Sequence, residues 1–447
     1  MRIFPRILLC LILLVLLACR ATRPLPKTAT EAFAQEPDLR SAHVGICVFD
    51  PASSVYLYNY QADKYFVPAS NTKLFSLYAG LKCLGDSLPG IGYIENDTAI
   101  LLVPTGDPSL LHPDYTSQPV IDFLKNNKKN LYLADGGWHE QALGAGWSWD
   151  DYNDDYMAER SPLPVYGNVI RWIEEKERDE KQGGEFDSTT SVNSIPDISW
   201  KVGFSSDTSA KRFFVRRSRD ENNFELTLGK ERFKSQDVPF VTHGMASAVE
   251  LLKDTINREI IILQGPLNNH LRLRTIYSRP VDSLFRPMMY RSDNFFAEQT
   301  LLMAGARRLG EMNDERIIDT LLQTDLKDLP QRPSWVDGSG LSRYNLFTPQ
   351  DFVWLLNRMK NEFGLDRMKS LLPTGSVGTL SNYYKQDSGY IYAKTGSLSG
   401  VIALSGYLIT SKNRLLIFSI LVNNHIGNAG TIRRAVEAFL EDIRKKD

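Results

Sequence analysis

Three short motifs in this 447-residue chain contain the residue types that nucleophilic acyl transfer requires. Ser70 and Lys73 form an S-x-x-K motif, Ser292 and Asn294 belong to an S-D-N motif, and Lys394 begins a K-T-G motif. A serine hydroxyl is a weak nucleophile until a nearby base removes its proton, and a neutral lysine amine can be that base. Because Lys73 follows Ser70 by one helical turn, both side chains lie on one helix face. The spacing therefore predicts Ser70 as a nucleophile and Lys73 as its base.

Each motif alone is common by chance, so the prediction depends on their order and surroundings. Residues 74–79 continue from Lys73 as an apolar run that is typical of a buried helix. The Lys394 motif ends one strand-like run, and residues 401–409 form a second one. An isolated serine or lysine is most often a solvated side chain. Three motifs in this order, each beside a predicted helix or strand, favour a single catalytic site.

The other motif residues suit the remaining tasks of acyl transfer. Lys394 is a candidate for the neighbouring charge that lowers the pKa of Lys73 and so keeps its amine neutral. Ser292 can relay a proton to the leaving amine, and Asn294 can hydrogen-bond a substrate amide. Lys394 and Thr395 suit a terminal carboxylate, the first by charge and the second by hydroxyl donation.

Two further residues complete the predicted site. Gly396 lets a substrate backbone lie close against the strand because it has no Cβ atom. The backbone N–H groups of Ser70 and Ser397 are expected to form an oxyanion hole. Together these residues predict a serine enzyme that cleaves a peptide ending in a carboxylate.

Composition narrows the possible partners. The formal net charge of −1 gives no electrostatic basis for binding nucleic acid. The six histidines are scattered, without the spacing of a metal site, and no cofactor motif is present. We therefore expect no metal, no cofactor and no nucleic-acid partner.

The N-terminus predicts export. Arg2 and Arg6 precede an apolar run over residues 7–17 that is too short to span a bilayer. The sequence that ends at Cys19 resembles a bacterial lipobox, so residues 1–18 are predicted to be a signal peptide and Cys19 a lipidated membrane anchor. The alternative is an ordinary secretory signal. Residues 19–39 are predicted to be a tether, and the contexts of Cys47 and Cys83 favour free thiols.

The pattern along the chain predicts an α/β (α+β) fold. Residues 43–49 and 54–59 are expected to form a hairpin, residues 70–84 a helix, residues 401–409 and 415–422 two strands, and residues 429–445 a closing helix. These elements predict an antiparallel sheet flanked by helices, in a domain made of residues 40–88 and 241–447.

Residues 89–240 are predicted to be a β-rich inserted domain or pair of domains. The charged run 171–181 is expected to be a solvated face or a loop. After the insert, residues 281–308 are expected to carry Ser292 into one long helix.

With these features in place, the sequence resembles the class C low-molecular-mass penicillin-binding proteins, the penicillin-binding protein 4-type D-Ala-D-Ala carboxypeptidase/endopeptidases. The resemblance runs from about Val44 to the C-terminus and includes G-D-P-S-L at 106–110 and D-G-S-G-L-S-R at 337–343. It implies a serine β-lactamase/DD-peptidase-like fold on the periplasmic side of the bacterial envelope. It also implies peptidoglycan stem peptides as substrates and β-lactam antibiotics as covalent inhibitors.

The resemblance implies a second group of binding residues. Arg343, Asp151 and Tyr156 correspond to residues that contact the free end of the stem-peptide diamino acid. For Asp151 and Tyr156, a turn and a packed aromatic residue are an equally good interpretation. Two alternative functions stay open, a β-lactamase and a catalytically silent peptidoglycan-binding lipoprotein. The intact set of Ser70, Lys73, Ser292 and Lys394 argues against the second.

Overall fold

The structure is a computed structural model that describes residues 36–180, 186–207, 209–231, 233–265 and 272–446. The predicted signal peptide, Cys19 and most of the predicted tether lie outside the described residues. The last residues of that segment belong to the folded domain, because Pro37–Leu39 form a short 3-10 turn in which Leu39 is buried. Cys47 and Cys83 are both free thiols.

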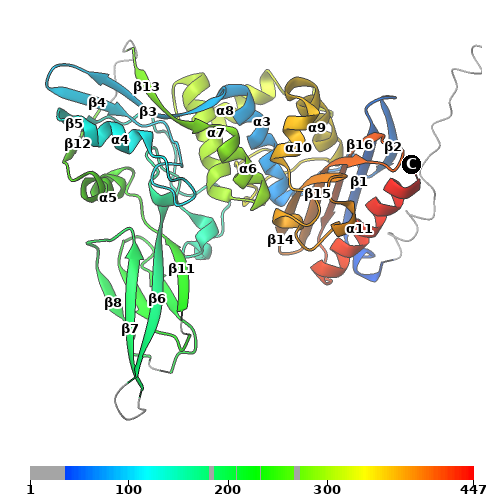
Figure 1. Cartoon of the computed structure of the whole chain (residues 1–447). Helices are drawn as coiled ribbons and strands as arrows, with labels where there is room; N and C mark the ends of the chain where they lie inside the picture. Colours follow the sequence, from blue (N-terminus) through cyan, green and yellow to red (C-terminus); the bar gives the residue numbers. More distant parts are fainter. Residues whose placement is uncertain (1–35, 181–185, 208, 232, 266–271, 447) are drawn as a thin grey trace, which may run out of the picture.

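The central sheet joins the two ends of the chain. Its five antiparallel strands stand in the order β14-β15-β16-β1-β2 (Figure 1). Their bounds are β1 His43–Asp50, β2 Val55–Tyr60, β14 Ile391–Leu398, β15 Val401–Ile409 and β16 Leu415–Asn423. Strand β1 pairs along its length with β16, and helix α11 (Ala429–Lys446) packs on β15. The predicted antiparallel sheet flanked by helices is confirmed.

Helices cover the other face of this sheet. They are α3 Lys73–Cys83, α6 Asp282–Tyr290, α7 Asn294–Leu309, α8 Asp314–Gln323, α9 Pro349–Phe363 and α10 Leu365–Leu371. The residues of α3 are buried from Lys73 to Leu81, so the helix is enclosed on all sides, as its apolar run predicts. It packs mainly against α7. The Ser70 and Lys73 motif at its start is therefore fixed by the core of the domain.

A second five-stranded sheet forms the first part of the insert. Its order is β12-β5-β4-β3-β13, with bounds β3 Ser87–Glu95, β4 Ala99–Val103, β5 Asn130–Leu133, β12 Ile260–Ile262 and β13 Arg274–Pro280. Helices α4 (Pro119–Asn126) and α5 (Ala246–Ile256) pack on it. Because β12 and β13 pair with strands of the insert, this sheet extends past residue 240, where the sequence predicted the insert to end.

The second part of the insert projects from the rest of the molecule (Figure 1). It contains two three-stranded sheets, β11-β6-β7 and β8-β10-β9. The bounds are β6 Val169–Glu180, β7 Phe186–Ile195, β8 Val202–Phe204, β9 Phe214–Arg217, β10 Phe224–Thr227 and β11 Phe233–Pro239.

The charged run predicted as a solvated face or loop lies in β6. Arg171 and Glu175 are exposed, whereas Trp172 and Glu174 between them are buried. This alternation is that of a strand with one solvated face. Glu174 Oε1 accepts a hydrogen bond from the Gly229 N–H at 3.0 Å, whereas Oε2 is buried without a hydrogen-bond partner among the described residues.

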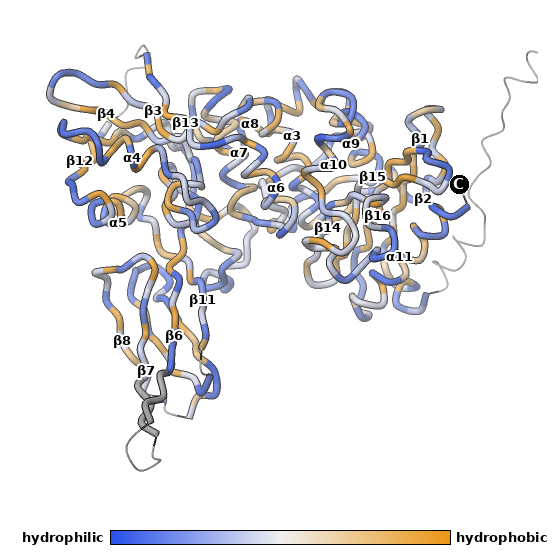
Figure 2. The backbone as a smooth tube through the Cα atoms, viewed as in Figure 1, coloured by the Kyte–Doolittle hydropathy of each residue, from blue (hydrophilic) through white to orange (hydrophobic). Residues whose placement is uncertain are grey.

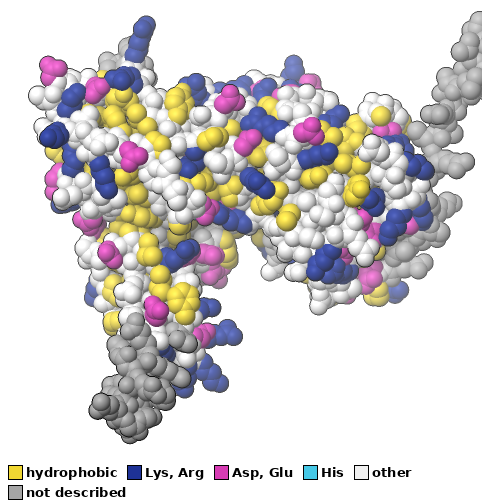
Figure 3. Space-filling view, viewed as in Figure 1, with side chains coloured by type: hydrophobic (Ala, Val, Ile, Leu, Met, Phe, Trp, Pro, Cys, Tyr) yellow, Lys and Arg dark blue, Asp and Glu magenta, His cyan; other side chains and the backbone are white. Residues whose placement is uncertain are grey.

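The surface carries charges of both signs, in keeping with the formal net charge of −1. Apolar residues follow the strands and helices of the interior (Figure 2), and charged side chains of both signs are spread over the face shown in Figure 3. Among the described residues, no helix is long and apolar enough to cross a membrane.

Candidate active site

Lys73 is the first residue of α3, directly after the 3-10 turn Ala69–Thr72 that carries Ser70. Its Nζ atom donates to Ser70 Oγ at 2.9 Å, to Asn294 Oδ1 at 2.6 Å and to the Ser339 carbonyl at 2.7 Å. Burial lowers the pKa of Lys73 to about 8, against the opposing charge of Asp337. About a tenth of this amine is therefore neutral at pH 7.

Ser292 lies in a break between two helices, where the sequence predicted one continuous helix. Helix α6 ends at Tyr290 and α7 begins at Asn294, and Ser292 has a φ of +63°. Asp293 caps α7 by accepting a hydrogen bond from the Phe296 N–H at 2.9 Å. The break turns Asn294, the first residue of α7, toward Lys73.

Lys394 is fully buried on β14 and faces Ser292. Its Nζ atom donates to Ser292 Oγ at 2.8 Å and to the Thr395 carbonyl at 2.7 Å. Burial lowers the pKa of Lys394 well below its usual value, and the charge of Lys73 lowers it further. The sequence hypothesis gave Lys394 the role of lowering the pKa of Lys73. The structure shows burial as the cause at Lys73, with the charge of Lys73 acting on Lys394.

Gly396 brings β14 against the turn that carries the nucleophile. A Cβ atom at this position would lie 2.7 Å from the Pro68 carbonyl oxygen and 3.1 Å from Ser70 N. Glycine is therefore required by the close approach of the chain's own backbone, whereas the sequence predicted a close approach of the substrate. The Ser397 hydroxyl accepts a hydrogen bond from Arg433 Nη2 at 2.8 Å.

The turn at 337–343 completes the surroundings of Lys73. The Asp337 carboxylate accepts hydrogen bonds from the N–H groups of Gly340 at 2.8 Å and Ser342 at 2.7 Å. Gly340 has a φ of +86°, and a Cβ atom there would lie 1.9 Å from the Ala69 carbonyl oxygen. This turn places the Ser339 carbonyl against Lys73, a contact that the sequence analysis missed because it involves the backbone.

Glu298 is a second residue that the sequence analysis missed. It is 1% exposed on α7, and its Oε1 atom accepts a hydrogen bond from Ser339 N–H at 2.7 Å. Its Oε2 atom lies 3.6 Å from Arg160 Nη1, which comes from the insert. A carboxylate within the apolar run of residues 295–304 is the sequence signal that could have identified it.

Asp151 and Tyr156 come from the insert and lie close together. Burial raises the pKa of the Tyr156 phenol, and a hydrogen bond with the Asp151 carboxylate raises it further. The Tyr156 carbonyl accepts a hydrogen bond from Asn294 Nδ2 at 3.2 Å. Arg343, from the core domain, donates to the Ser399 carbonyl at 2.9 Å. Within the described part of the chain, no hydrogen bond or ion pair joins Arg343 to Asp151 or Tyr156.

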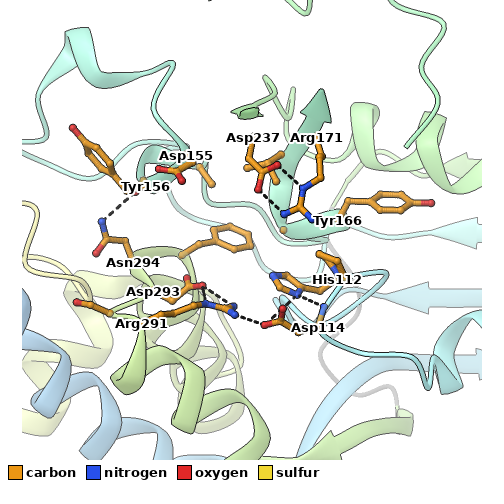
Figure 4. A pocket seen from close by; sticks show the side chains of 16 residues that line it. His112, Asp114, Asp155, Tyr156, Tyr166, Arg171, Asp237, Arg291, Asp293 and Asn294 are labelled. Carbon is orange, nitrogen blue, oxygen red and sulfur yellow. Dashed lines mark hydrogen bonds and ion pairs between the residues drawn. The ribbon is translucent and has the colours of Figure 1, made fainter. Parts of the chain in front are cut away.

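A cavity of about 400 Å³ connects the Ser292 motif to the insert (Figure 4). Ser292 and Asn294 form one wall, and Tyr156 and Asp155 form another. The ion pairs of Arg291 with Asp114 and Asp293, and of Arg171 with Asp237, line the rest (Figure 4). The insert therefore forms part of the wall of the candidate site.

Comparison with known proteins agrees with this geometry. Residues 27–443 match the model of the D-Ala-D-Ala carboxypeptidase 3 (S13) family. A D-alanyl-D-alanine carboxypeptidase from Actinomadura sp. (strain R39) is 25% identical over 442 residues, which cover 89% of this chain and 81% of the relative. The D-alanyl-D-alanine carboxypeptidase DacB from Haemophilus influenzae is 25% identical over 425 residues, with 86% of each chain covered.

Solved structures show the same fold. The crystal structure of penicillin binding protein 4 (dacB) from Haemophilus influenzae matches with a TM-score of 0.71 at 20% identity, over 93% of this chain and 98% of that one. The family match covers most of the chain and includes all three motifs. The chain therefore belongs to the D-Ala-D-Ala carboxypeptidase 3 (S13) family of serine peptidases.

Proposed function

We propose that Ser70 is the nucleophile of this D-Ala-D-Ala carboxypeptidase and that Lys73 is its general base. The observation that carries the proposal is the 2.9 Å contact between Lys73 Nζ and Ser70 Oγ, made by a fully buried lysine whose pKa is about 8. A base with a pKa near the working pH removes a proton efficiently and returns it efficiently.

During acylation, one proton moves from Ser70 to Lys73 and then to the leaving amine. Neutral Lys73 takes the Ser70 proton as Oγ bonds to the carbonyl carbon of the penultimate D-alanine. The N–H groups of Ser70 and Ser397 stabilise the oxyanion. The C–N bond breaks, and the proton passes to the leaving amine with Ser292 as the relay. Water hydrolyses the resulting ester and restores Ser70.

The remaining motif residues bind the substrate. Lys394 and Thr395 bind the terminal carboxylate, Asn294 binds the amide on the acyl side, and Gly396 allows the peptide to approach β14. Asp151 and Tyr156 bind the free end of the diamino acid from the insert, and Arg343 approaches it from the core domain. The contact of Asn294 with the Tyr156 carbonyl supports this arrangement because it ties the two groups together.

Substrate chemistry places the enzyme in the bacterial cell envelope, where peptidoglycan stem peptides occur. We propose that Cys19 carries a lipid anchor on the periplasmic side. β-Lactams would be covalent inhibitors of Ser70, and a β-lactam complex of penicillin binding protein 4 from Haemophilus influenzae shares the fold with a TM-score of 0.65. Cross-linked stem peptides present the same D-alanyl bond, so endopeptidase activity is part of the proposal.

One experiment tests the assignment of the nucleophile. Purified protein is incubated with a peptide ending in D-Ala-D-Ala and, separately, with penicillin. We expect D-alanine release and a covalent adduct on Ser70, and Ser70→Ala should lower both by a factor on the order of 10³ or more. Ser411→Ala, at an exposed turn, is the control. An adduct on another residue would contradict the assignment, and penicillin turnover without D-alanine release would favour a β-lactamase.

A further inference from the structure

Arg160 comes from the insert and is buried against the core domain. Its side chain is 2% exposed, and each of its three nitrogen atoms has a partner. Nε and Nη2 donate to the Gln141 carbonyl at 3.2 and 3.0 Å, Nη2 also donates to Glu140 at 3.1 Å, and Nη1 donates to Asp314, the first residue of α8. A planar guanidinium held at all its nitrogen atoms has a fixed orientation. Arg160 is therefore a rigid part of the boundary between the insert and the core domain.

The remaining partner of this guanidinium is Glu298. Nη1 lies 3.6 Å from Glu298 Oε2, which is the only ion pair of Glu298 among the described residues. Oε2 has no hydrogen-bond partner among them, whereas Oε1 accepts from the Ser339 N–H at 2.7 Å. Burial and the charge of Asp337 raise the pKa of Glu298 to about 7, and the charge of Arg160 lowers it. Because a buried carboxylate without a cation beside it takes up a proton, Arg160 favours the ionised form of Glu298.

Glu298 connects Arg160 to Lys73. Ser339 donates its N–H to Glu298, and its carbonyl accepts from Lys73 Nζ at 2.7 Å. The charge of Glu298 also favours the charged form of Lys73, as does the charge of Asp337, and both oppose the effect of burial. The other charged groups around Arg160, Glu298 and Lys73 come from several elements, and they are Glu140 in the insert, Asp293 before α7, Asp314 on α8 and Lys394 on β14.

We propose that Arg160 is a positioning residue for the reaction at Ser70, because it binds the Glu298 carboxylate, which in turn holds the Ser339 carbonyl against Lys73. In this arrangement the insert helps to fix the position and the charge state of a base that belongs to the core domain. The inference rests on the proposed role of Lys73 as the general base.

Two substitutions separate the charge of Arg160 from its shape, and both are measured by the acylation rate constant for a chromogenic β-lactam against pH. With Arg160→Gln, Glu298 should be protonated where Lys73 titrates. The midpoint should then fall from near pH 8 to about pH 7, and the maximum rate should fall about tenfold. Arg160→Lys keeps the charge but not the planar fork, so the midpoint should stay near pH 8 while the maximum rate falls about threefold. Arg219→Gln, which removes an exposed arginine paired with Asp220 in the insert, should change neither value.

A double variant tests whether Arg160 acts through Glu298. When Arg160→Gln is combined with Glu298→Gln, no carboxylate at position 298 is left without its cation, so the double variant should fold even if Arg160→Gln alone does not. Its midpoint and maximum rate should match those of Glu298→Gln alone to within about threefold. A larger further loss, or an Arg160→Gln protein whose midpoint stayed near pH 8, would overturn the proposal. A wild-type protein that formed no penicillin adduct on Ser70 would instead contradict the proposed function.

Discussion

Two lysine amines are buried in one site, and their environments differ. Lys73 has the carboxylates of Asp337 and Glu298 near it, whereas Lys394 has hydroxyl and carbonyl oxygen partners. The carboxylates favour the charged form of Lys73 and keep its pKa at about 8 despite complete burial. Because only neutral Lys73 can take a proton, the acylation rate should rise with pH and level off above about 8.

Glu298→Gln should move this pH dependence to lower pH. Burial and the nearby Asp337 charge raise the pKa of Glu298 to about 7, so its carboxylate is charged where Lys73 titrates. Glutamine keeps the oxygen that accepts from Ser339 N–H but removes the negative charge, which should lower the pKa of Lys73. The measurement is the acylation rate constant for a chromogenic β-lactam as a function of pH.

Glu221→Gln removes an exposed carboxylate from the insert and serves as the control for charge. With this control substitution, the midpoint of the pH dependence of the acylation rate should stay near pH 8. A midpoint that also stayed in place for Glu298→Gln, with the fold intact, would show that Glu298 positions the Ser339 turn without acting on the charge of Lys73.

At the scale of elements, the break between α6 and α7 is what places Asn294. Two helix N-caps in the helical part of the core domain allow a matched test of whether the α7 cap positions Asn294. Asp293 caps α7 by accepting from Phe296 N–H at 2.9 Å, and Asn313 caps α8 by accepting from Arg316 N–H at 2.8 Å. Alanine at either position should lower the free energy of unfolding by about 1 kcal/mol.

Only Asp293→Ala should also slow β-lactam acylation, by about tenfold, because it frees the residue that contacts Lys73. Unfolding in denaturant and the acylation rate are measured for both variants. If both variants acylated equally fast, the cap would stabilise α7 without positioning Asn294.

The same elements show what the sequence could and could not predict. The helix that follows Ser70, the hairpin 43–59 and the two C-terminal strands follow from local pattern and are confirmed. The break at Ser292 could not be predicted from local pattern, because the apolar pattern of residues 281–308 continues through it. Its positive φ occurs where the Ser292 hydroxyl contacts Lys394, and that residue lies on β14.

Long-range pairing explains the other differences. The three isoleucines of β12 suit a strand, but local pattern does not show that they pair with β5 of the insert. The Ser339 carbonyl contact with Lys73 has no side-chain signature, since every residue has a carbonyl group. Ser70, Lys73 and Lys394 could be singled out from the sequence because their proposed chemistry depends on side-chain type. The predicted effect of Lys394 on the pKa of Lys73 depends on the surroundings instead, and the structure shows burial as the cause.

At the scale of the whole molecule, the insert and the core domain meet around the catalytic lysine. Trp147 Nε1 donates to the Asp337 carboxylate at 3.0 Å, and Arg160 lies beside Glu298. Asn294 donates to the Tyr156 carbonyl. Each contact joins a residue of the insert to a residue that touches Lys73 or supports its turn.

Asp151→Ala should separate substrate recognition from acylation. Removing the carboxylate should lower kcat/KM about tenfold on peptides whose diamino acid has a free amino group, because remote contacts position the reacting carbonyl. Penicillin, which has no such group, should acylate at an unchanged rate. Asp150→Ala, which removes the adjacent and exposed carboxylate, is the control. Equal losses on both substrates would give Asp151 a structural role.

The order of strands in the central sheet has a consequence for biosynthesis. Strand β1 is made long before its partner β16, because His43 pairs with Asn423. Lys394 is also held by β15, which pairs with β16. Contacts between such distant segments form late in folding. A nascent chain that has not yet reached β16 therefore lacks the sheet that presents Lys394 to Ser292, and hydrolytic activity is withheld until β16 has been made.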